Sequence, residues 1–127
     1  MSKYLILIYD EEAAWMNASE DVANELMAKH NAFGEKNGEA VLGGNALQSV
    51  STATTLRPDG SGGLTVTDGP FLETKEYLAS WYLLDVDSEA RALEIAAELP
   101  SAKYRPVEVW PILHEASRET GDDMGVA

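Results

Sequence analysis

The chain has 127 residues, which is enough for one domain with its own hydrophobic core. It contains no cysteine, so disulfides, zinc–thiolate sites, iron–sulfur clusters and a thiol nucleophile are excluded. Asp and Glu outnumber Lys and Arg by 22 to 9, and such a surface repels phosphate backbones and anionic membranes. We therefore expect a cytoplasmic protein that binds neither nucleic acid nor a membrane.

The first predicted element is a strand over Lys3–Tyr9, whose apolar run is too short to span a membrane. Odd and even positions are both apolar there, and the same holds for Tyr77–Val86. A strand that is covered on one face only would alternate between apolar and polar residues. The sequence therefore predicts two strands whose sheet is covered on both faces.

Two helices are predicted from their end signals. Ser19 caps a helix with an acidic first turn, and Asn37–Gly38 closes it. Ser88 caps the second helix, which ends at Pro100. The inner face of the first helix is predicted to consist of Val22, Leu26, His30 and Phe33.

Three further predictions complete the order of elements. Ala40–Leu47 is read as a strand, and its Gly43–Gly44 pair indicates a bulge or a close backbone approach. Ser51–Arg57 and Gly63–Thr67 flank the turn sequence "PDGSGG" and predict a β-hairpin. Pro106–Leu113 is the last strand.

Without the hairpin, this order is the βαββαβ pattern of the ferredoxin-like fold, in the α+β class. Two helices cover only one face of its sheet, so the other face needs a partner, and an identical subunit is the simplest one. We therefore expect a homodimer that forms a dimeric α+β barrel with a cavity between its sheets. The domain is expected over residues 1–114, followed by an acidic, flexible tail over residues 115–127.

The stretch "DGPFLETKE", residues 68–76, combines a turn signal with four ionisable groups. One interpretation is a turn that carries a small ion-pair network, since such networks are common. The other is a polar wall at the mouth of the cavity. In that case Asp68 or Glu76 accepts a proton, and Lys75, with Glu73 on the same side of the chain, binds an anionic substrate.

His30 is either a core histidine with one hydrogen bond or a general base, because its ordinary pKa lies near neutrality. Tyr82 and Trp110 are either core and dimer-interface residues or the lining of an aromatic pocket that binds substrate. The chain shows no ligand spacing such as HExxH, so neither a metal nor another cofactor is expected.

The segments "TATTLR", "VTDGPFLETKE" and "YLASWYLLDV" closely resemble the YCII-related family, in the branch named for its DGPF motif. The similarity covers about residues 3 to 113. It implies a ferredoxin-like dimeric α+β barrel. In the short YCII branch of the family a His–Asp pair is the suspected catalytic dyad, and His30 matches its histidine by its place on the first helix. The segment Leu99–Tyr104, where the acid is expected, contains no Asp. Asp68 or Glu76 would have to replace it in space.

Two functions follow from the resemblance. Some YCII-related proteins resemble enzymes that act on small ring compounds, which implies a small cytosolic enzyme or a small-molecule binding protein with an acid/base site. Several DGPF members are encoded beside, or fused to, extracytoplasmic-function sigma factors. This implies, as the alternative, a non-catalytic regulatory or accessory protein associated with a sigma factor.

Overall fold

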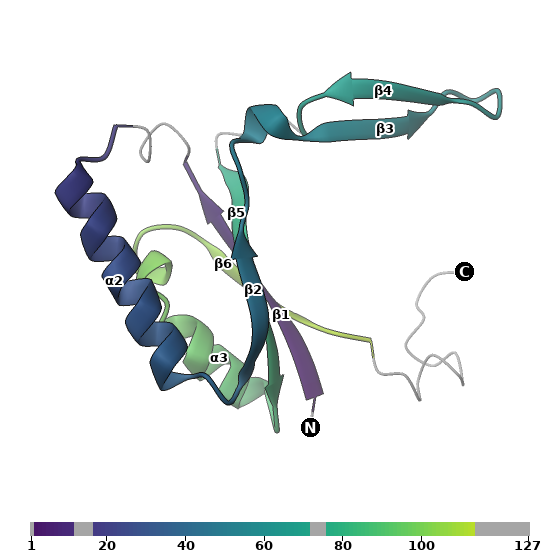
Figure 1. The fold of residues 1–127 in the computed structure, drawn as a ribbon. Coiled ribbons are helices and arrows are strands. Elements are labelled where there is room, and N and C mark those ends of the chain that lie inside the picture. Colours follow the sequence, from purple (N-terminus) through teal and green to yellow (C-terminus); the bar gives the residue numbers. More distant parts are fainter. Residues whose placement is uncertain (1, 12–16, 72–75, 114–127) are drawn as a thin grey trace.

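The computed structural model describes residues 2–11, 17–71 and 76–113. Within these ranges the body of the molecule is one sheet with two α-helices packed on one of its faces (Figure 1). The elements of the body are β1 (Ser2–Asp10), α2 (Glu20–Lys36), β2 (Val41–Ala46), β5 (Tyr77–Val86), α3 (Glu89–Ala97), the short 3-10 helix η2 (Pro100–Lys103) and β6 (Val107–Pro111).

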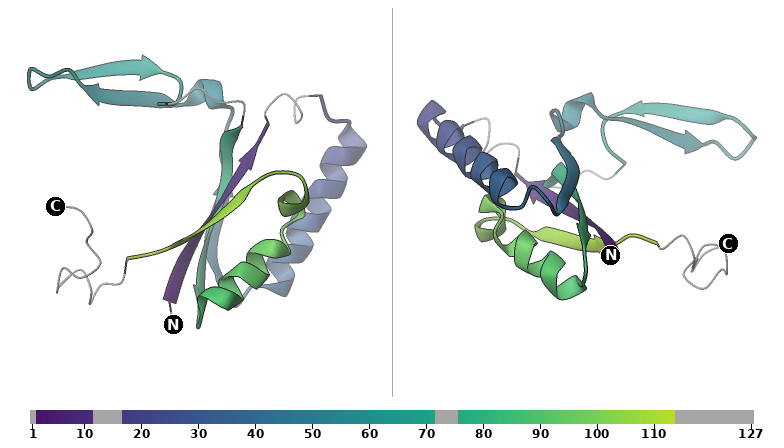
Figure 2. Two further views of the ribbon diagram at one scale, coloured as in Figure 1. Left: turned by 180° about the vertical axis from the view of Figure 1, so that it is seen from behind. Right: turned by 60° about the horizontal axis from the view of Figure 1, so that its bottom comes forward.

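The strand order in the sheet is β2-β5-β1-β6, and every neighbouring pair is antiparallel. Both helices lie on the same side of this sheet (Figure 2). Because the helices connect β1 to β2 and β5 to β6, this arrangement is consistent with the ferredoxin-like fold. The α+β class predicted from the sequence is therefore confirmed.

The predicted starts of both helices and the predicted end of α2 are also confirmed, whereas α3 ends at Ala97, before the predicted end at Pro100. The Ser19 hydroxyl accepts a hydrogen bond from the Val22 N–H at 3.2 Å, and the Ser88 hydroxyl accepts one from the Arg91 N–H at the same distance. At the other end of α2, the Asn37 N–H donates to the Phe33 carbonyl oxygen at 3.0 Å. Local sequence signals thus determine where both helices start and where α2 stops.

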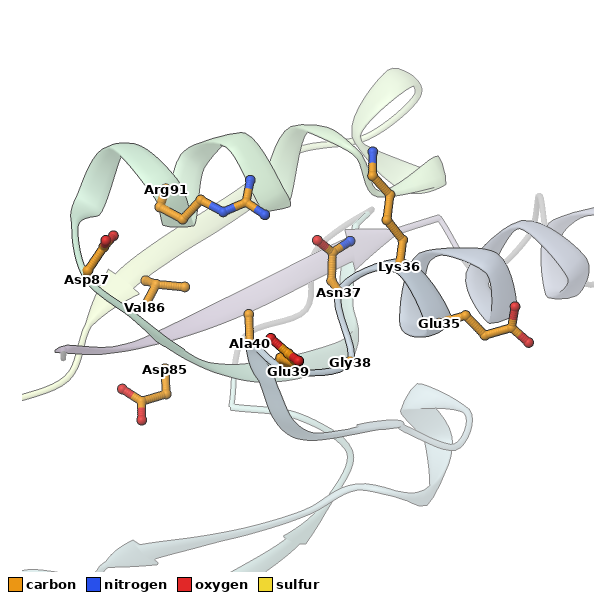
Figure 3. A pocket seen from close by; sticks show the side chains of 10 residues that line it. All are labelled: Glu35, Lys36, Asn37, Gly38, Glu39, Ala40, Asp85, Val86, Asp87 and Arg91. Atoms are coloured by element: carbon orange, nitrogen blue, oxygen red, sulfur yellow. The ribbon is translucent and has the colours of Figure 1, made fainter.

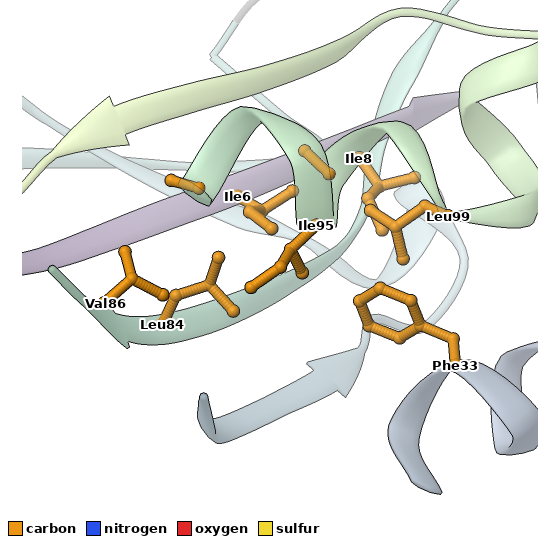
Figure 4. Close-up of a cluster of buried hydrophobic side chains, with 9 residues drawn as sticks. Ile6, Ile8, Phe33, Leu84, Val86, Ile95 and Leu99 are labelled. Carbon is orange, nitrogen blue, oxygen red and sulfur yellow. The ribbon is translucent and has the colours of Figure 1, made fainter. Parts of the chain in front are cut away.

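The hydrophobic core lies between the sheet and the helices (Figure 4). Alternate residues of β1 and β5 point into it, and α3 contributes its apolar face, whereas Phe33 is the one fully buried residue that α2 provides among the described residues. The large apolar side chains of this core are Ile6, Ile8, Phe33, Leu84, Val86, Ile95 and Leu99.

The opposite face of the sheet, here called the open face, carries the other residues of the same strands. Leu5 pairs with Leu83, and Leu7 pairs with Trp81, so all four side chains point away from the helices. These four residues are half-buried in the single chain. The strands are therefore apolar on both faces, as the sequence predicts, while only one face is covered by helices.

The predicted hairpin forms a separate two-stranded sheet of β3 (Thr54–Pro58) and β4 (Leu64–Asp68), preceded by the 3-10 helix η1 (Val50–Thr52). It projects from one end of the main sheet, on the side away from the helices (Figures 1 and 2). The Asp59 carboxylate closes its turn by accepting hydrogen bonds from the backbone N–H groups of Ser61 and Gly63, at 2.8 and 3.1 Å.

Candidate functional site

Helix α2 lies close to the sheet at Phe33 and further from it toward its N-terminus (Figure 1). The predicted inner face therefore becomes progressively more exposed: Phe33 is buried, His30 and Leu26 are half-buried, and Val22 is 47% exposed. Val22 shares the predicted face but is not buried, because the helix diverges from the sheet before it reaches that turn. The first half of α2 forms the wall of a cleft instead.

This cleft, which we call the α2 cleft, has a volume of about 450 Å³ and lies between α2 and the segment that joins η2 to β6. Its apolar wall contains Ala18, Val22 and Leu26, and its polar groups include His30 and Ser101. A neighbouring cleft of about 510 Å³ lies on the β2 and β5 side of His30. His30, Asp10 and Ser101 line both clefts and so form the boundary between them.

Burial lowers the pKa of His30 below its ordinary value of 6.5, because desolvation disfavours the charged imidazolium. Burial therefore favours the neutral form of the ring over the imidazolium. A neutral imidazole has one nitrogen that can accept a proton and one that donates a hydrogen bond. His30 is thus in the protonation state that a general base requires.

Asp10 and Arg105 lie at the edge of the α2 cleft. Nη2 of Arg105 lies 3.1 Å from a Glu11 carboxylate oxygen, and its Nε lies 3.7 Å from Oδ1 of Asp10. The side chains of Asp10 and Arg105 are only 18% and 30% exposed, so this pair is better shielded from water than an ordinary surface ion pair. The Arg105 guanidinium and the half-buried His30 therefore line the same cleft.

Three residues of the α2 cleft are not among the site residues predicted from the sequence: Asp10, Ser101 and Arg105. The positions of two of them in the sequence indicate that they lie close together, because Asp10 ends the first strand and Arg105 precedes the last strand. These strands are neighbours and antiparallel, and the Tyr9 N–H donates to the Pro106 carbonyl oxygen at 3.3 Å. The predicted topology alone thus brings the two charged residues together.

The "DGPF" stretch lies at another place, where the hairpin joins the main sheet. Gly69 has a φ of +98°, which confirms the predicted turn. Gly69, Pro70 and Glu76 line a cleft of about 1060 Å³ together with Tyr9 and Leu78, and we call it the motif cleft. Tyr9 and Leu78 pair across β1 and β5, and the Tyr9 hydroxyl interacts with Glu108 of β6.

The structure therefore does not bring the predicted catalytic residues together. His30 lines the α2 cleft, Glu76 lines the motif cleft, and Asp68 is an exposed residue at the end of β4 opposite Thr54. Glu73 and Lys75 lie outside the described residues, as does the predicted tail. Asp10 is the carboxylate residue that lines both clefts together with His30, whereas Glu25 lines only the α2 cleft.

The two predicted aromatic residues lie on opposite faces of the sheet. Tyr82 is on the helix side, where its ring centroid lies 5.3 Å from that of Phe33, and burial raises the pKa of its hydroxyl. Trp110 pairs with Leu5 on the open face and donates from its indole nitrogen to Glu108 at 3.2 Å. Tyr82 lines the cleft beside His30, whereas Trp110 belongs to the surface expected at the dimer interface.

A further cleft, of about 630 Å³, lies at the far end of the two helices (Figure 3). Its cations are already engaged: Lys36 lies 2.9 Å from Glu98, and Arg91 lies 3.1 Å from Glu94. Hydrogen bonds from Asn37 and then Lys36 lower the pKa of the Glu98 carboxyl. The contacts of Lys36 and Asn37 with Glu98 join the end of α2 to the end of α3, so we assign this region to the fold.

The described residues contain no cluster of three or more His, Asp or Glu side chains that could hold a metal ion. In the same part of the chain, no helix has the length and apolar character needed to cross a membrane.

The fold and the α2 cleft define a small α+β domain in which apolar and polar side chains line a cleft between α2 and the segment that joins η2 to β6. The sequence pattern of the YCII-related domain matches residues 2–114. An uncharacterised protein of Rhizobium meliloti (strain 1021) is 37% identical over 101 residues, which cover 78% of this chain and 81% of that protein. The chain therefore belongs to the YCII-related family, as its resemblance predicts. Its place in the DGPF branch stays a prediction.

Proposed function

We propose that this protein binds a small organic molecule in the α2 cleft and that His30 accepts a proton from it. The observation that carries the proposal is the state of His30: half-buried, held neutral by desolvation, and facing clefts on both sides. A histidine that served only in packing would be enclosed by its neighbours, as Phe33 of the same helix is.

The other residues of the α2 cleft indicate the chemistry of the ligand. The apolar wall of Ala18, Val22 and Leu26 suits a ring or a short hydrocarbon body. On the opposite side, the Ser101 hydroxyl and the Arg105 guanidinium can orient an oxygen-bearing group. Small aromatic or lactone acids combine these features, and the family resemblance implies ring compounds of that kind.

Thermal-shift measurements with a panel of small aromatic and lactone acids test this proposal, because a ligand that binds only the folded state raises the melting temperature as its concentration grows. We expect His30→Gln to weaken the binding of a hit by about tenfold or more, since the amide cannot take up the proton. The control is His114→Gln, which removes the other histidine of the chain. Equal affinities for the wild type and His30→Gln would contradict the proposal.

We also propose that two chains pack through their open faces and form a dimeric α+β barrel. The half-buried side chains of Leu5, Leu7, Trp81 and Leu83 support this, since they form an apolar surface on a sheet whose other face is already covered. The motif cleft would then lie at the edge of the space between the sheets, because Tyr9 and Leu78 line it. Sedimentation equilibrium tests the dimer, and a stable monomer at low micromolar concentration would contradict it.

A further inference from the structure

The hairpin of β3 and β4 has one apolar and one polar face. Leu56 pairs with Val66, and Pro58 pairs with Leu64, so these four side chains share a face. The other face carries Arg57 with Thr65, and Thr55 with Thr67. The apolar face is open to solvent in the single chain: Leu56 is 60% exposed, and Leu64 and Val66 are each 64% exposed.

Contacts within the chain hold the base of the hairpin but leave this apolar face uncovered. The Thr55 hydroxyl donates to the Gly69 carbonyl oxygen at 2.7 Å, and the Arg57 guanidinium lies 4.4 Å from the centre of the Phe71 ring. Both side chains belong to the polar face or its margin. A two-stranded hairpin alone is only marginally stable in water, so its apolar face needs a third surface to pack on.

The direction in which the hairpin projects indicates which molecule supplies the surface on which its apolar face packs. It projects from the main sheet on the side opposite the helices, so it overhangs whatever packs on the open face (Figures 1 and 2). Its five-residue strands span about 17 Å, whereas stacked sheets lie about 10 Å apart. The hairpin is therefore long enough to reach past the sheet of a second copy and contact its edge.

A matching apolar surface lies at the other end of the same sheet. Trp110 is 53% exposed and Ile112 is 42% exposed, at the end of the edge strand β6. β6 runs antiparallel to β1, with Pro111 opposite Tyr4, whereas the hairpin leaves the sheet at the Asp10 end of β1. The hairpin connects β2 to β5, whereas β6 is the edge strand on the other side of the sheet. A two-fold axis that lies between the sheets and runs obliquely to the strands would bring each hairpin over the end of the partner's β6.

We propose that the hairpin is an arm that clasps a second copy of this chain, with Leu56, Leu64 and Val66 packed on the end of the second copy's β6 at Trp110 and Ile112. The proposal rests on the dimer proposed above and adds the contact that fixes its orientation. The two arms are equivalent, so the contact forms twice in each dimer.

Sedimentation equilibrium of matched charge variants tests the arm. Val66→Asp adds a carboxylate to the apolar face, and Thr65→Asp adds the same group to the polar face of the same strand. We expect Val66→Asp to raise the dimer dissociation constant by about tenfold or more, and Thr65→Asp to leave it within about twofold. A dimer that Val66→Asp does not weaken would overturn the arm but not the dimer, whereas a monomeric wild type would overturn both.

Cross-linking locates the contact, and the chain is well suited to it because it has no cysteine. Val66→Cys protein is mixed with Ile112→Cys protein and treated with a short bismaleimide. We expect a product that links one chain of each kind, and much less of it when Thr65→Cys replaces Val66→Cys. Equal yields from the two mixtures, or no product from either, would overturn the assigned contact.

Discussion

The ring of Tyr82 lies where a side chain at position 44 would have to be. A Cβ atom on Gly44 would lie 2.6 Å from Cδ1 of Tyr82 and 2.6 Å from the Trp81 carbonyl oxygen. Because Gly44 has no side chain, the Tyr82 ring can lie across β2 and reach Phe33 on α2, with ring centroids 5.3 Å apart. This contact joins β2, β5 and α2 beside the cleft that His30 lines.

Gly44→Ala is therefore expected to destabilise the protein by about 1–3 kcal/mol, since the ring and the backbone must both move to admit a methyl group. Gly43→Ala is the matched control, because a Cβ atom there meets nothing within 4 Å. We expect it to change the free energy of unfolding by less than about 1 kcal/mol. Urea denaturation at one protein concentration compares the two, and equal midpoints would contradict the role given to Tyr82.

The sequence predicted this region well, because its signals are local. The Gly43–Gly44 pair indicates either a bulge or a close backbone approach, and the structure has both. The pairing register between β2 and β5 shifts between Val41 and Gly43, and the Tyr82 ring approaches Gly44. Strand periodicity and helix caps likewise define the order of elements, and that order is the signature of the fold.

Two Gly→Ala changes are expected to have opposite signs. Gly69 has a φ of +98°, a conformation that costs a residue with a Cβ atom about 1–2 kcal/mol, so Gly69→Ala should lower the melting temperature. Gly34 lies within α2, where a Cβ atom meets nothing within 4 Å, so Gly34→Ala should stabilise by about 0.5–1 kcal/mol. Thermal unfolding checks both, and a shift of the same sign in both variants would contradict this account.

The pKa of His30 predicts how stability depends on pH. Burial lowers the folded-state pKa below the unfolded value of about 6.5, so the unfolded chain binds the proton more readily. The contribution of the neutral, half-buried His30 to the free energy of unfolding is fully present above pH 6.5. It is lost as the pH falls from 6.5 through the folded-state pKa of His30. An NMR titration of the imidazole signals, with His114→Gln used to assign them, should give a His30 pKa below 6.5, and a value above it would contradict the burial argument.

The ion pairs of Arg105 are expected to contribute more than those of Arg91. Arg105→Gln removes the guanidinium from the partly buried Asp10 and Glu11 and should cost about 1 kcal/mol or more. Arg91→Gln breaks an exposed pair with Glu94 and should cost less than about 0.5 kcal/mol. Chemical denaturation measures both values. If Arg105→Gln lowers the free energy of unfolding by no more than Arg91→Gln does, the ion pairs of Arg105 do not stabilise the edge of the α2 cleft.

The candidate site could be predicted only in part, because it depends on the angle of α2 to the sheet. Periodicity places His30 and Val22 on the same face of the helix as Phe33, but it does not show that the helix diverges from the sheet before Val22. The sequence also suggested one site for His30 and Glu76, which the structure places in different clefts. The roles of Asp68, Glu73, Lys75 and Glu76, and the sigma-factor association, stay predictions.

The most direct test of the central claim is a two-dimensional ¹H–¹⁵N NMR titration of the protein with a ligand found in the thermal-shift screen. If the ligand binds in the α2 cleft, the largest shift changes should be at Val22, Leu26, His30 and Ser101, and His30→Gln should raise the ligand concentration needed to produce them by about tenfold or more. Largest changes at Ser51, Glu76 and Leu78, with His30 unaffected, would place the ligand in the motif cleft and contradict the account.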